Sequence, residues 1–374
     1  MARVSPTVLA VCHQLVPMPD NYWRWSPEKR QVHDKQVIDH IEKAANDGNP
    51  VAVECLRSMR RPTKRRNPSK ASLPGRLAVV TCYFNPVGYA SRAKNAERFY
   101  RAARSQGADL WTVEAVLPGQ QPLCPPAKQT LQTSLPDVLW VKENLLNLVI
   151  RSLPDTYDKV AWVDTDLLFD NPHWVDETAE KLQSHPVVQL FDTVLFLDEH
   201  DVPVYWFEDT LHRHSIPYRC QRGKNAKDLV AGHCGMGWAA RRDALGDRGL
   251  YEHHICGSGD AIMCAGFYGW WDHGIVNRHR ANKAMTASIL DWGRPIYEQV
   301  QGDVGYTPGT VRHMYHGTRE DRQYDPRLDA LRVHRYDPAA HLEKTSEGVF
   351  KWSDRAPDEL KRRVAAYFAS RNED

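Results

Sequence analysis

The stretch YDKVAWVDTDLLFDN (residues 157–171) joins an apolar run directly to two aspartates. The run from Val160 to Val163 predicts a buried strand, and Asp164 and Asp166 follow at its end. One aspartate is common in the turn after a strand, so a turn alone explains only one of them. In an extended chain the two carboxylates face the same side, where their repulsion raises the pKa of one unless a cation lies between them. Because Mg²⁺ and Mn²⁺ favour carboxylate oxygen, the pair predicts a metal or catalytic site.

Strands and helices alternate on both sides of this stretch. Apolar runs predict strands over 76–84, 109–117, 159–166 and 187–192, and amphipathic segments predict helices over 91–108, 142–154 and 173–185. This alternation predicts an α/β fold with a mixed, mainly parallel sheet flanked by helices. Sites in such sheets form at the carboxyl ends of strands. Tyr83 and Asn85 end one predicted strand as Asp164 and Asp166 end another, so we expect both pairs on one edge of the sheet.

Composition is that of a globular protein. The 374 residues are 42% hydrophobic and 26% charged, so the chain can form a large core that does not depend on disulfides or structural metals for stability. The eight cysteines form no C-x-x-C pair, so no zinc site is indicated. No apolar stretch approaches the roughly 18 residues of a membrane span, and the first residues lack a signal-peptide cleavage site. We therefore expect a cytoplasmic, reducing setting and no membrane partner.

Positive charge is concentrated in one segment near the N-terminus. Residues 27–59 are expected to be helical, with Ser26 as the N-cap and Pro27 at the first helical position. Residues 57–76 then hold eight Lys or Arg, three prolines and no acid. This composition favours a linker or basic arm over a packed element. Two interpretations stay open, a solvated tether and a contact with a polyanion.

Three later stretches complete an ordered set. After the Asp-x-Asp strand come GHCGMGWAARRDAL (232–245), GLYEHHICGSGDAIMCAGF (249–267) and VRHMYHGTREDRQY (311–324). In order and spacing, this set resembles the GT-A fold of nucleotide-sugar glycosyltransferases. The resemblance implies an N-terminal helical extension with a basic arm over 1–75, a GT-A catalytic domain over 76–324 and a C-terminal helical extension over 325–374.

The resemblance implies a metal centre and a donor. In it, Asp166 ligates Mn²⁺ or Mg²⁺, and Asp164 contacts the metal or the ribose. His316 is the third protein ligand, with His313 as the alternative; either could also be an ordinary residue, since the chain has 17 histidines. The implied donor is a nucleotide-sugar, and UDP is the nucleotide that this family most often uses. The metal neutralises the charge that grows on its diphosphate as the hexosyl or pentosyl group leaves.

A catalytic base and a cation for the leaving group also follow from the resemblance. In inverting members the corresponding segment holds the carboxylate that takes the proton of the acceptor hydroxyl, and here this is Asp260. The stretch CGSGD (256–260) lets the backbone approach the sugar and presents Asp260 at a helix start. The alternative is that Asp260 only caps that helix, which is worth about 1 kcal/mol. Arg319 or Arg322 would steady the diphosphate through its fork of donors.

The segment TCYFNPVGYASRAKN (81–95) is the expected nucleotide site. In this interpretation Tyr83 stacks on the base, Asn85 hydrogen-bonds it and Arg92 reaches phosphate. Lys142 and Glu143 precede the Asp-x-Asp strand and would line the same cleft. An ordinary helix surface explains the last two residues equally well.

The acceptor is predicted from residues 198–230, an insertion rich in aromatic, His and Arg side chains. Such side chains suit stacking on bases and holding phosphate, and they equally suit stacking on sugar rings. Together with the 57–76 arm they favour nucleic acid. In general organisation the chain is similar to phage and kinetoplastid GT-A enzymes that glycosylate hydroxymethylated pyrimidines, such as 5-hydroxymethylcytosine, in DNA. A bacteriophage enzyme of this kind would act in the host cytoplasm; a cell-surface glycan is the alternative acceptor.

Two other classes of protein are alternatives. A phosphatase of the haloacid dehalogenase kind also has Asp-x-Asp after an apolar strand. That family has Thr or Val at the position of Leu168 in this chain. It also has a second acidic residue, late in the sequence, at the position of Cys264. A nucleic-acid-binding module without catalysis would explain the basic segment but not the paired aspartates.

Overall fold

A computed structural model describes residues 27–49, 52, 73–124, 129–205, 212–223, 232–271, 274–279, 281–324 and 326–374. The chain divides into two compact units, Met1–Ser69 and Lys70–Asp374. In the first unit, helix α2 (Pro27–Asn46) occupies the first part of the range expected to be helical. Most of the basic segment 57–76 lies outside the described residues, so its role as tether or polyanion contact stays a prediction.

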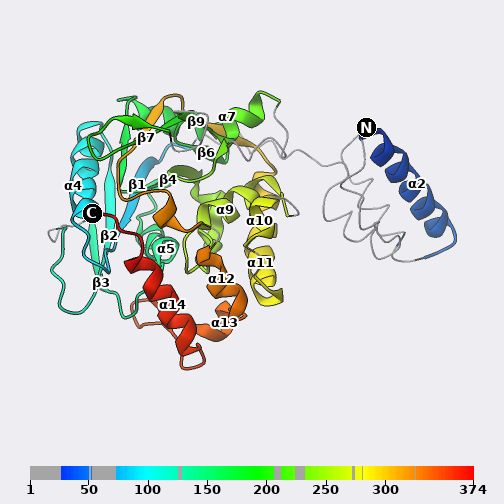
Figure 1. Ribbon diagram of the computed structural model, residues 1–374. Helices are drawn as coiled ribbons and strands as arrows, with labels where there is room; N and C mark the ends of the chain where they lie inside the picture. Colours follow the sequence, from blue (N-terminus) through cyan, green and yellow to red (C-terminus); the bar gives the residue numbers. More distant parts are fainter. Residues whose placement is uncertain are drawn as a thin grey trace. The chain divides into compact units, whose positions relative to one another are not determined.

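The second unit is built on a seven-stranded sheet in the order β12-β6-β11-β4-β1-β2-β3 (Figure 1). Its strands are β1 (Arg76–Tyr83), β2 (Leu110–Val116), β3 (Thr130–Ser134), β4 (Tyr157–Val163), β6 (Val187–Gln189), β11 (Gly237–Arg241) and β12 (Val304–Tyr306). Strand β11 runs antiparallel to β4 and β6, whereas the other pairings in this sheet are parallel. The expected α/β fold, with a mixed and mainly parallel sheet flanked by helices, is therefore confirmed.

Both faces of this sheet are covered, and the alternation of side chains along β1 shows how. Ala78 and Val80 point into one core, which includes residues of α5 (Lys142–Ser152), α9 (Gly259–Tyr268) and α11 (Lys283–Val300). Leu77 and Val79 point into the other, which α4 (Ala90–Ser105) and α6 (Trp174–Lys181) share. The helices expected over 91–108, 142–154 and 173–185 are thus confirmed as α4, α5 and α6.

The segment after residue 325 also packs into the first of these cores. It forms α12 (Pro326–Val333), α13 (Pro338–His341), a hairpin of β14 (Leu342–Lys344) and β15 (Phe350–Trp352), and α14 (Asp358–Ala369). Buried side chains from α12, β15 and α14 belong to the same apolar cluster as β1 and α5. The C-terminal segment therefore combines helices with a β-hairpin, and it shares the core of the sheet.

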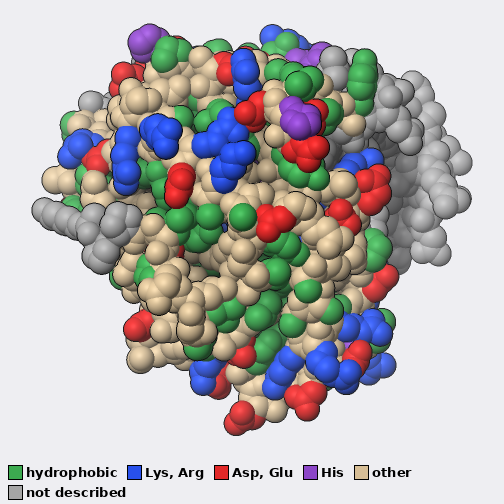
Figure 2. All heavy atoms as spheres, turned by 60° about the vertical axis from the view of Figure 1, so that its left-hand side comes forward, with side chains coloured by type: hydrophobic (Ala, Val, Ile, Leu, Met, Phe, Trp, Pro, Cys, Tyr) green, Lys and Arg blue, Asp and Glu red, His purple; other side chains and the backbone are tan. Residues whose placement is uncertain are grey.

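Helix α4 shows why the flanking helices bury one side. Its buried residues are Asn95, Ala96, Phe99, Tyr100 and Ala103, which recur at the spacing of one helical face. Lys94, Arg101 and Arg104 are exposed. On the side of the molecule that carries α4, Figure 2 shows Lys and Arg side chains gathered toward the upper part of the view. Within the described ranges, neither α4 nor another helix has the length and apolar character that crossing a membrane requires.

A second sheet, which the sequence did not predict, lies beyond the paired aspartates. Its order is β10-β9-β7-β13-β5, with β8 paired to β7. The strands are β5 (Leu167–Phe169), β7 (Thr193–Leu197), β8 (Pro203–Val204), β9 (His212–Ser215), β10 (Gly232–His233) and β13 (Thr310–His313). Because β4 ends at Val163 and β5 begins at Leu167, Asp164 and Asp166 lie where the chain passes from one sheet to the other.

Candidate metal centre and acidic cluster

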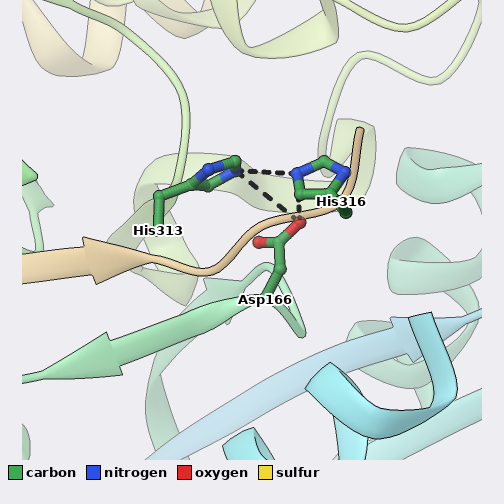
Figure 3. A group of neighbouring side chains, drawn as sticks. All are labelled: Asp166, His313 and His316. Carbon is green, nitrogen blue, oxygen red and sulfur yellow. Dashed lines mark hydrogen bonds and ion pairs between the residues drawn. The ribbon is translucent and has the colours of Figure 1, made fainter. Parts of the chain in front are cut away.

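Strand pairing brings Asp166 to two histidines that are distant in sequence. Strand β13 runs antiparallel to β5 with His313 opposite Leu167, and the Met314 N–H donates to the Asp166 carbonyl at 2.8 Å. The chain then turns so that His316 faces the same carboxylate. Figure 3 shows the two imidazoles above the Asp166 side chain, one at the end of β13 and one in the loop beyond it.

The three side chains form a compact set of ligand atoms. Asp166 Oδ2 lies 3.1 Å from His316 Nε2 and 3.7 Å from His313 Nε2, and the two Nε2 atoms are 3.0 Å apart. One atom from each residue falls within 4.8 Å of the others. The second carboxylate oxygen, Asp166 Oδ1, is buried without a hydrogen-bond partner among the described residues. A buried carboxylate oxygen left in this way fits a cation as its missing partner.

Both imidazoles are poised to be neutral, as metal ligands must be. Burial, followed by the neighbouring Arg322 guanidinium, lowers the pKa of His316 to about 3. Burial and Arg322 also hold the pKa of His313 well below its usual value. One carboxylate and two imidazoles suit a first-row divalent ion such as Mn²⁺ better than Mg²⁺, which prefers oxygen ligands throughout. The sequence predicted His316 as a metal ligand beside Asp166, with His313 as the alternative. In the structure both histidines lie beside the Asp166 carboxylate.

Asp164 lies in a neighbouring acidic cluster. Its Oδ1 is 2.6 Å from Lys142 Nζ, at the first residue of α5, and the same Nζ is 3.2 Å from Asp260 Oδ2. Lys142 is buried, and both carboxylates hold its pKa well above the usual value against the opposing effect of burial. The two aspartates of the motif therefore point to different partners, Asp164 to Lys142 and Asp166 to the histidines. The sequence indicated only that Lys142 lines the cleft. In the structure it contacts the carboxylates of two predicted site residues, Asp164 and Asp260.

Glu143 is the third carboxyl group of this cluster. A Cβ at Gly259 would lie 2.4 Å from Glu143 Oε1, so the glycine of the predicted turn makes room for this carboxyl group. Burial, opposed by Lys142 and reinforced by Asp260, raises the pKa of Glu143 to about 8. Burial also raises the pKa of Asp164 to about 7, again opposed by Lys142 and reinforced by Asp260 and Asp166. Lys142 thus contacts two carboxylates, and its charge also opposes the rise in the pKa of the Glu143 carboxyl group.

Replacing Glu143 by glutamine is expected to stabilise the metal-free protein at alkaline pH. A carboxyl whose pKa rises from 4.5 to about 8 on folding favours the folded state while protonated, and this stability is lost as the pH rises toward 8. Glutamine mimics the protonated form and cannot ionise. In excess chelator, Glu143→Gln should match the unmodified protein at pH 5 and melt several degrees higher at pH 8.5. Calorimetry across this range measures the difference; equal melting temperatures at pH 8.5 would contradict the assignment.

Asp260 is not the N-cap of its helix. The N-cap of α9 is Ser258, which has φ 72° and makes no side-chain capping bond, and Asp260 lies in the first turn. Its carboxylate is turned to Lys142 instead. A carboxylate in the first turn still interacts favourably with the helix dipole. The capping alternative therefore does not describe this side chain, while its role as catalytic base remains a proposal.

The predicted nucleotide residues occupy the turn after β1. Tyr83 is buried, and its hydroxyl accepts a hydrogen bond from Asn85 Nδ2 at 3.2 Å. The Asn85 amide also donates to the Tyr89 carbonyl at 2.8 Å and accepts from the Tyr89 N–H at 3.0 Å. Strands β1 and β4 are parallel neighbours, so this turn and the paired aspartates share one edge of the sheet, as expected. Direct contacts of Tyr83 and Asn85 with a nucleotide remain predictions.

The three predicted phosphate-binding arginines differ in their surroundings. Arg322 is buried against the His316 imidazole and donates to the His316 carbonyl at 3.1 Å. Arg92 NH1 lies 3.2 Å from Glu373 Oε2. Arg319 is exposed, at the start of the short 3₁₀ turn Glu320–Arg322. The structure thus brings Arg322 to the histidines and links Arg92 to Glu373, which itself contacts His316.

Glu373 is the residue near the metal centre that the sequence did not reveal. Its Oε1 lies 3.3 Å from His316 Nδ1 and accepts from Arg371 Nε at 2.6 Å. Burial alone would raise the pKa of Glu373, but Arg92, His316 and Arg371 together hold it far below its usual value. No local pattern indicates this role, because the contact joins residues 57 positions apart.

The predicted acceptor segment is only partly described. Within residues 198–230, the ranges 198–205 and 212–223 are described, and Tyr205 is 67% exposed. Trp206 and the cations at 224–230 lie outside the described residues. A stacking role for this insertion therefore stays a prediction.

Comparison with known proteins gives limited similarity. No protein-family model matches the chain, and no curated protein matches its sequence. Among solved structures, the Drosophila beta1,4-galactosyltransferase 7 catalytic domain in complex with xylobiose is 10% identical, with a TM-score of 0.34 over 78% of this chain and 98% of that chain. A mutant of the same protein in complex with manganese, UDP-Gal and xylobiose is 11% identical, with a TM-score of 0.33 over 77% and 98%. Similarity at this level assigns the chain to no family, so function is inferred from the site.

Proposed function

We propose that the chain is a metal-dependent GT-A glycosyltransferase that moves a sugar from a nucleotide-sugar to a hydroxyl acceptor. One observation supports this most directly. Asp166 is partly exposed, but its Oδ1 atom is buried without a described partner, and its carboxylate faces two imidazoles whose pKa values favour the neutral form. This set lies where the chain leaves the edge of a mainly parallel sheet, the usual position of a nucleotide-sugar site in the fold that the sequence resembles.

The acidic cluster supplies the groups for an inverting transfer. Asp260 takes the proton of the acceptor hydroxyl as that oxygen bonds to the anomeric carbon and the bond from this carbon to the diphosphate breaks. Lys142 orients Asp260 and Asp164 through one ammonium group. A metal held by Asp166, His313 and His316 would act as a Lewis acid toward the diphosphate. Asp164, which pairs with Lys142, would contact the ribose or the metal from the neighbouring cluster.

The donor is proposed to be a UDP-sugar held by the turn after β1. Tyr83, Asn85 and Arg92 line this turn, and Arg319 and Arg322 lie beyond the histidines. A donor screen by mass spectrometry tests the proposal: the protein is incubated with Mn²⁺ and a panel of nucleotide-sugars, and the released nucleotide is identified. Turnover of p-nitrophenyl phosphate without turnover of any nucleotide-sugar would favour the phosphatase alternative.

For the acceptor, hydroxymethylated DNA is the first candidate and a glycan the second. The DNA proposal depends on the eight cations of residues 57–76 and on the aromatic insertion at 198–230. In this proposal the Tyr205 ring, which is 67% exposed, stacks on the acceptor. Transfer assays against hydroxymethylated DNA, unmodified DNA and simple oligosaccharides separate the two.

If the basic arm holds DNA, replacing Arg60, Arg61, Lys64, Arg65 and Arg66 together by alanine should weaken binding and make it less sensitive to salt. Each phosphate contact releases counterions, so fewer contacts give a shallower dependence of affinity on salt concentration. UDP-sugar binding should not change, because none of these five residues belongs to the proposed donor site. Fluorescence anisotropy of labelled DNA at several salt concentrations measures this. Efficient transfer to a neutral oligosaccharide with no DNA binding at low salt would leave the glycan as acceptor.

A further inference from the structure

The residues that follow α14 pack against the loop that carries His316. Gly317, next to His316, has φ +91°, and a Cβ there would lie 2.7 Å from the Arg371 carbonyl oxygen and 2.9 Å from that of Asn372. Asn372 Nδ2 donates to Asp321 Oδ1 at 3.1 Å, in the 3₁₀ turn Glu320–Arg322 that follows this loop. The segment around residue 372 is thus held against this loop by close backbone approach and by side-chain contacts.

This packing places the Glu373 carboxylate behind the His316 ring. Glu373 is 1% exposed, and its two oxygens face His316 Nδ1 at 3.3 Å, Arg92 NH1 at 3.2 Å and two donors of Arg371, Nε at 2.6 Å and NH2. A carboxylate between two guanidinium groups acts only as an acceptor. A hydrogen on His316 Nδ1 satisfies this contact. Arg322 NH2, which can only donate, lies against both ring nitrogens, and in this tautomer it donates to Nε2. Nε2, which is 3.1 Å from Asp166 Oδ2, is then the ring nitrogen that carries the lone pair, and in the metal-free protein this nitrogen also faces Arg322 NH2.

We propose that Glu373 is a positioning residue that fixes the tautomer and orientation of His316 so that Nε2 is presented to a divalent metal. The arrangement is a carboxylate–histidine pair behind a metal ligand, which raises the basicity of the ligand and fixes its ring. Arg322 lies against the same imidazole and donates to the His316 carbonyl at 3.1 Å. The inference rests on the metal centre of the proposed function and does not depend on the identity of the donor or acceptor.

The first test concerns the metal-free protein. Two-dimensional NMR of protein with ¹⁵N-labelled histidine reports which ring nitrogen carries the hydrogen, and the His316 signal is assigned from a His316→Asn variant. We expect His316 to carry its hydrogen on Nδ1 in the unmodified protein and to lose this preference in Glu373→Gln. A hydrogen on Nε2 in the unmodified protein would overturn the inference, even if the variant failed to fold.

The second test is Mn²⁺ affinity, measured by electron paramagnetic resonance. Glu373→Gln should bind Mn²⁺ about 10- to 100-fold more weakly, the usual effect of losing such an outer carboxylate, and Glu373→Asp should recover part of the affinity. Glu359→Gln is the matched control, since Glu359 on α14 pairs with Arg363 at 3.2 Å away from the site. Equal affinities of folded Glu373→Gln and unmodified protein would overturn the inference. Absence of Mn²⁺ binding by the unmodified protein would instead contradict the proposed function.

Discussion

Replacing Asp166 by alanine is expected to abolish sugar transfer and to remove measurable Mn²⁺ binding. Asp166 supplies the one carboxylate of the three-residue cluster, and its Oδ1 has no described partner within the protein. Without it, the cluster keeps two neutral imidazoles and loses the negatively charged carboxylate ligand that Mn²⁺ favours. The loss should exceed the roughly 10- to 100-fold effect of removing an outer carboxylate. Excess chelator should reproduce the loss of activity in the unmodified protein.

Asp170→Ala is the matched control for this variant. Asp170 follows β5 directly and pairs with Arg312 at 2.8 Å on a partly exposed surface, outside the cluster. Its replacement should leave Mn²⁺ binding and transfer unchanged. Full transfer activity of Asp166→Ala, or of the unmodified protein in excess chelator, would show that the cluster is not a catalytic metal centre.

Replacing Asp260 by asparagine is expected to lower kcat by about 10²-fold or more while donor binding is retained, the usual scale for loss of a general base. Asparagine keeps the shape of the side chain and an oxygen to accept from Lys142 Nζ, now 3.2 Å from Asp260 Oδ2. It cannot take a proton. Isothermal titration with the nucleotide-sugar separates binding from turnover, and steady-state kinetics gives kcat.

Asp291→Asn serves as control for the Asp260 variant, because Asp291 pairs with Arg248 at 3.2 Å on the surface. If Asp260→Asn lowers the melting temperature and leaves kcat unchanged, Asp260 only balances the charge of Lys142. In that case the base must be sought among the other carboxyl groups of the cluster, where burial raises the pKa of Asp164 to about 7.

Local sequence patterns predicted the main sheet because its central strands are buried and their sequences are therefore apolar runs. The apolar runs at β1 and β4 and the amphipathic spacing of α4, α5 and α6 are properties of neighbouring residues. Parallel pairing of β1 with β4 then places their carboxyl ends together, so Asp164, Asp166 and Asn85 could be placed on one edge. Part of the site was therefore predictable from the order of strands.

What local patterns could not predict are contacts made by strands of two to five residues and by distant segments. The second sheet contains β8 and β10, of two residues each, which are too short to show a period. It is the β5–β13 pairing in this sheet that joins His313 to Asp166. Likewise, Gly259 was expected to let a sugar approach the backbone, yet its close neighbour is the Glu143 carboxyl group. The identity of such a neighbour depends on tertiary packing.

The most direct test of the proposed function is hydrolysis of nucleotide-sugars in the absence of an acceptor. Slow transfer to water is expected of a glycosyltransferase, since water can enter where the acceptor hydroxyl binds. The unmodified protein and Asp166→Ala are incubated with UDP-sugars and Mn²⁺, and released UDP is measured by mass spectrometry. We predict Mn²⁺-dependent release of UDP by the unmodified protein and none by Asp166→Ala. Failure of the unmodified, Mn²⁺-loaded protein to release the nucleotide from any nucleotide-sugar, or equal release by both proteins, would contradict a metal-dependent glycosyltransferase centred on Asp166.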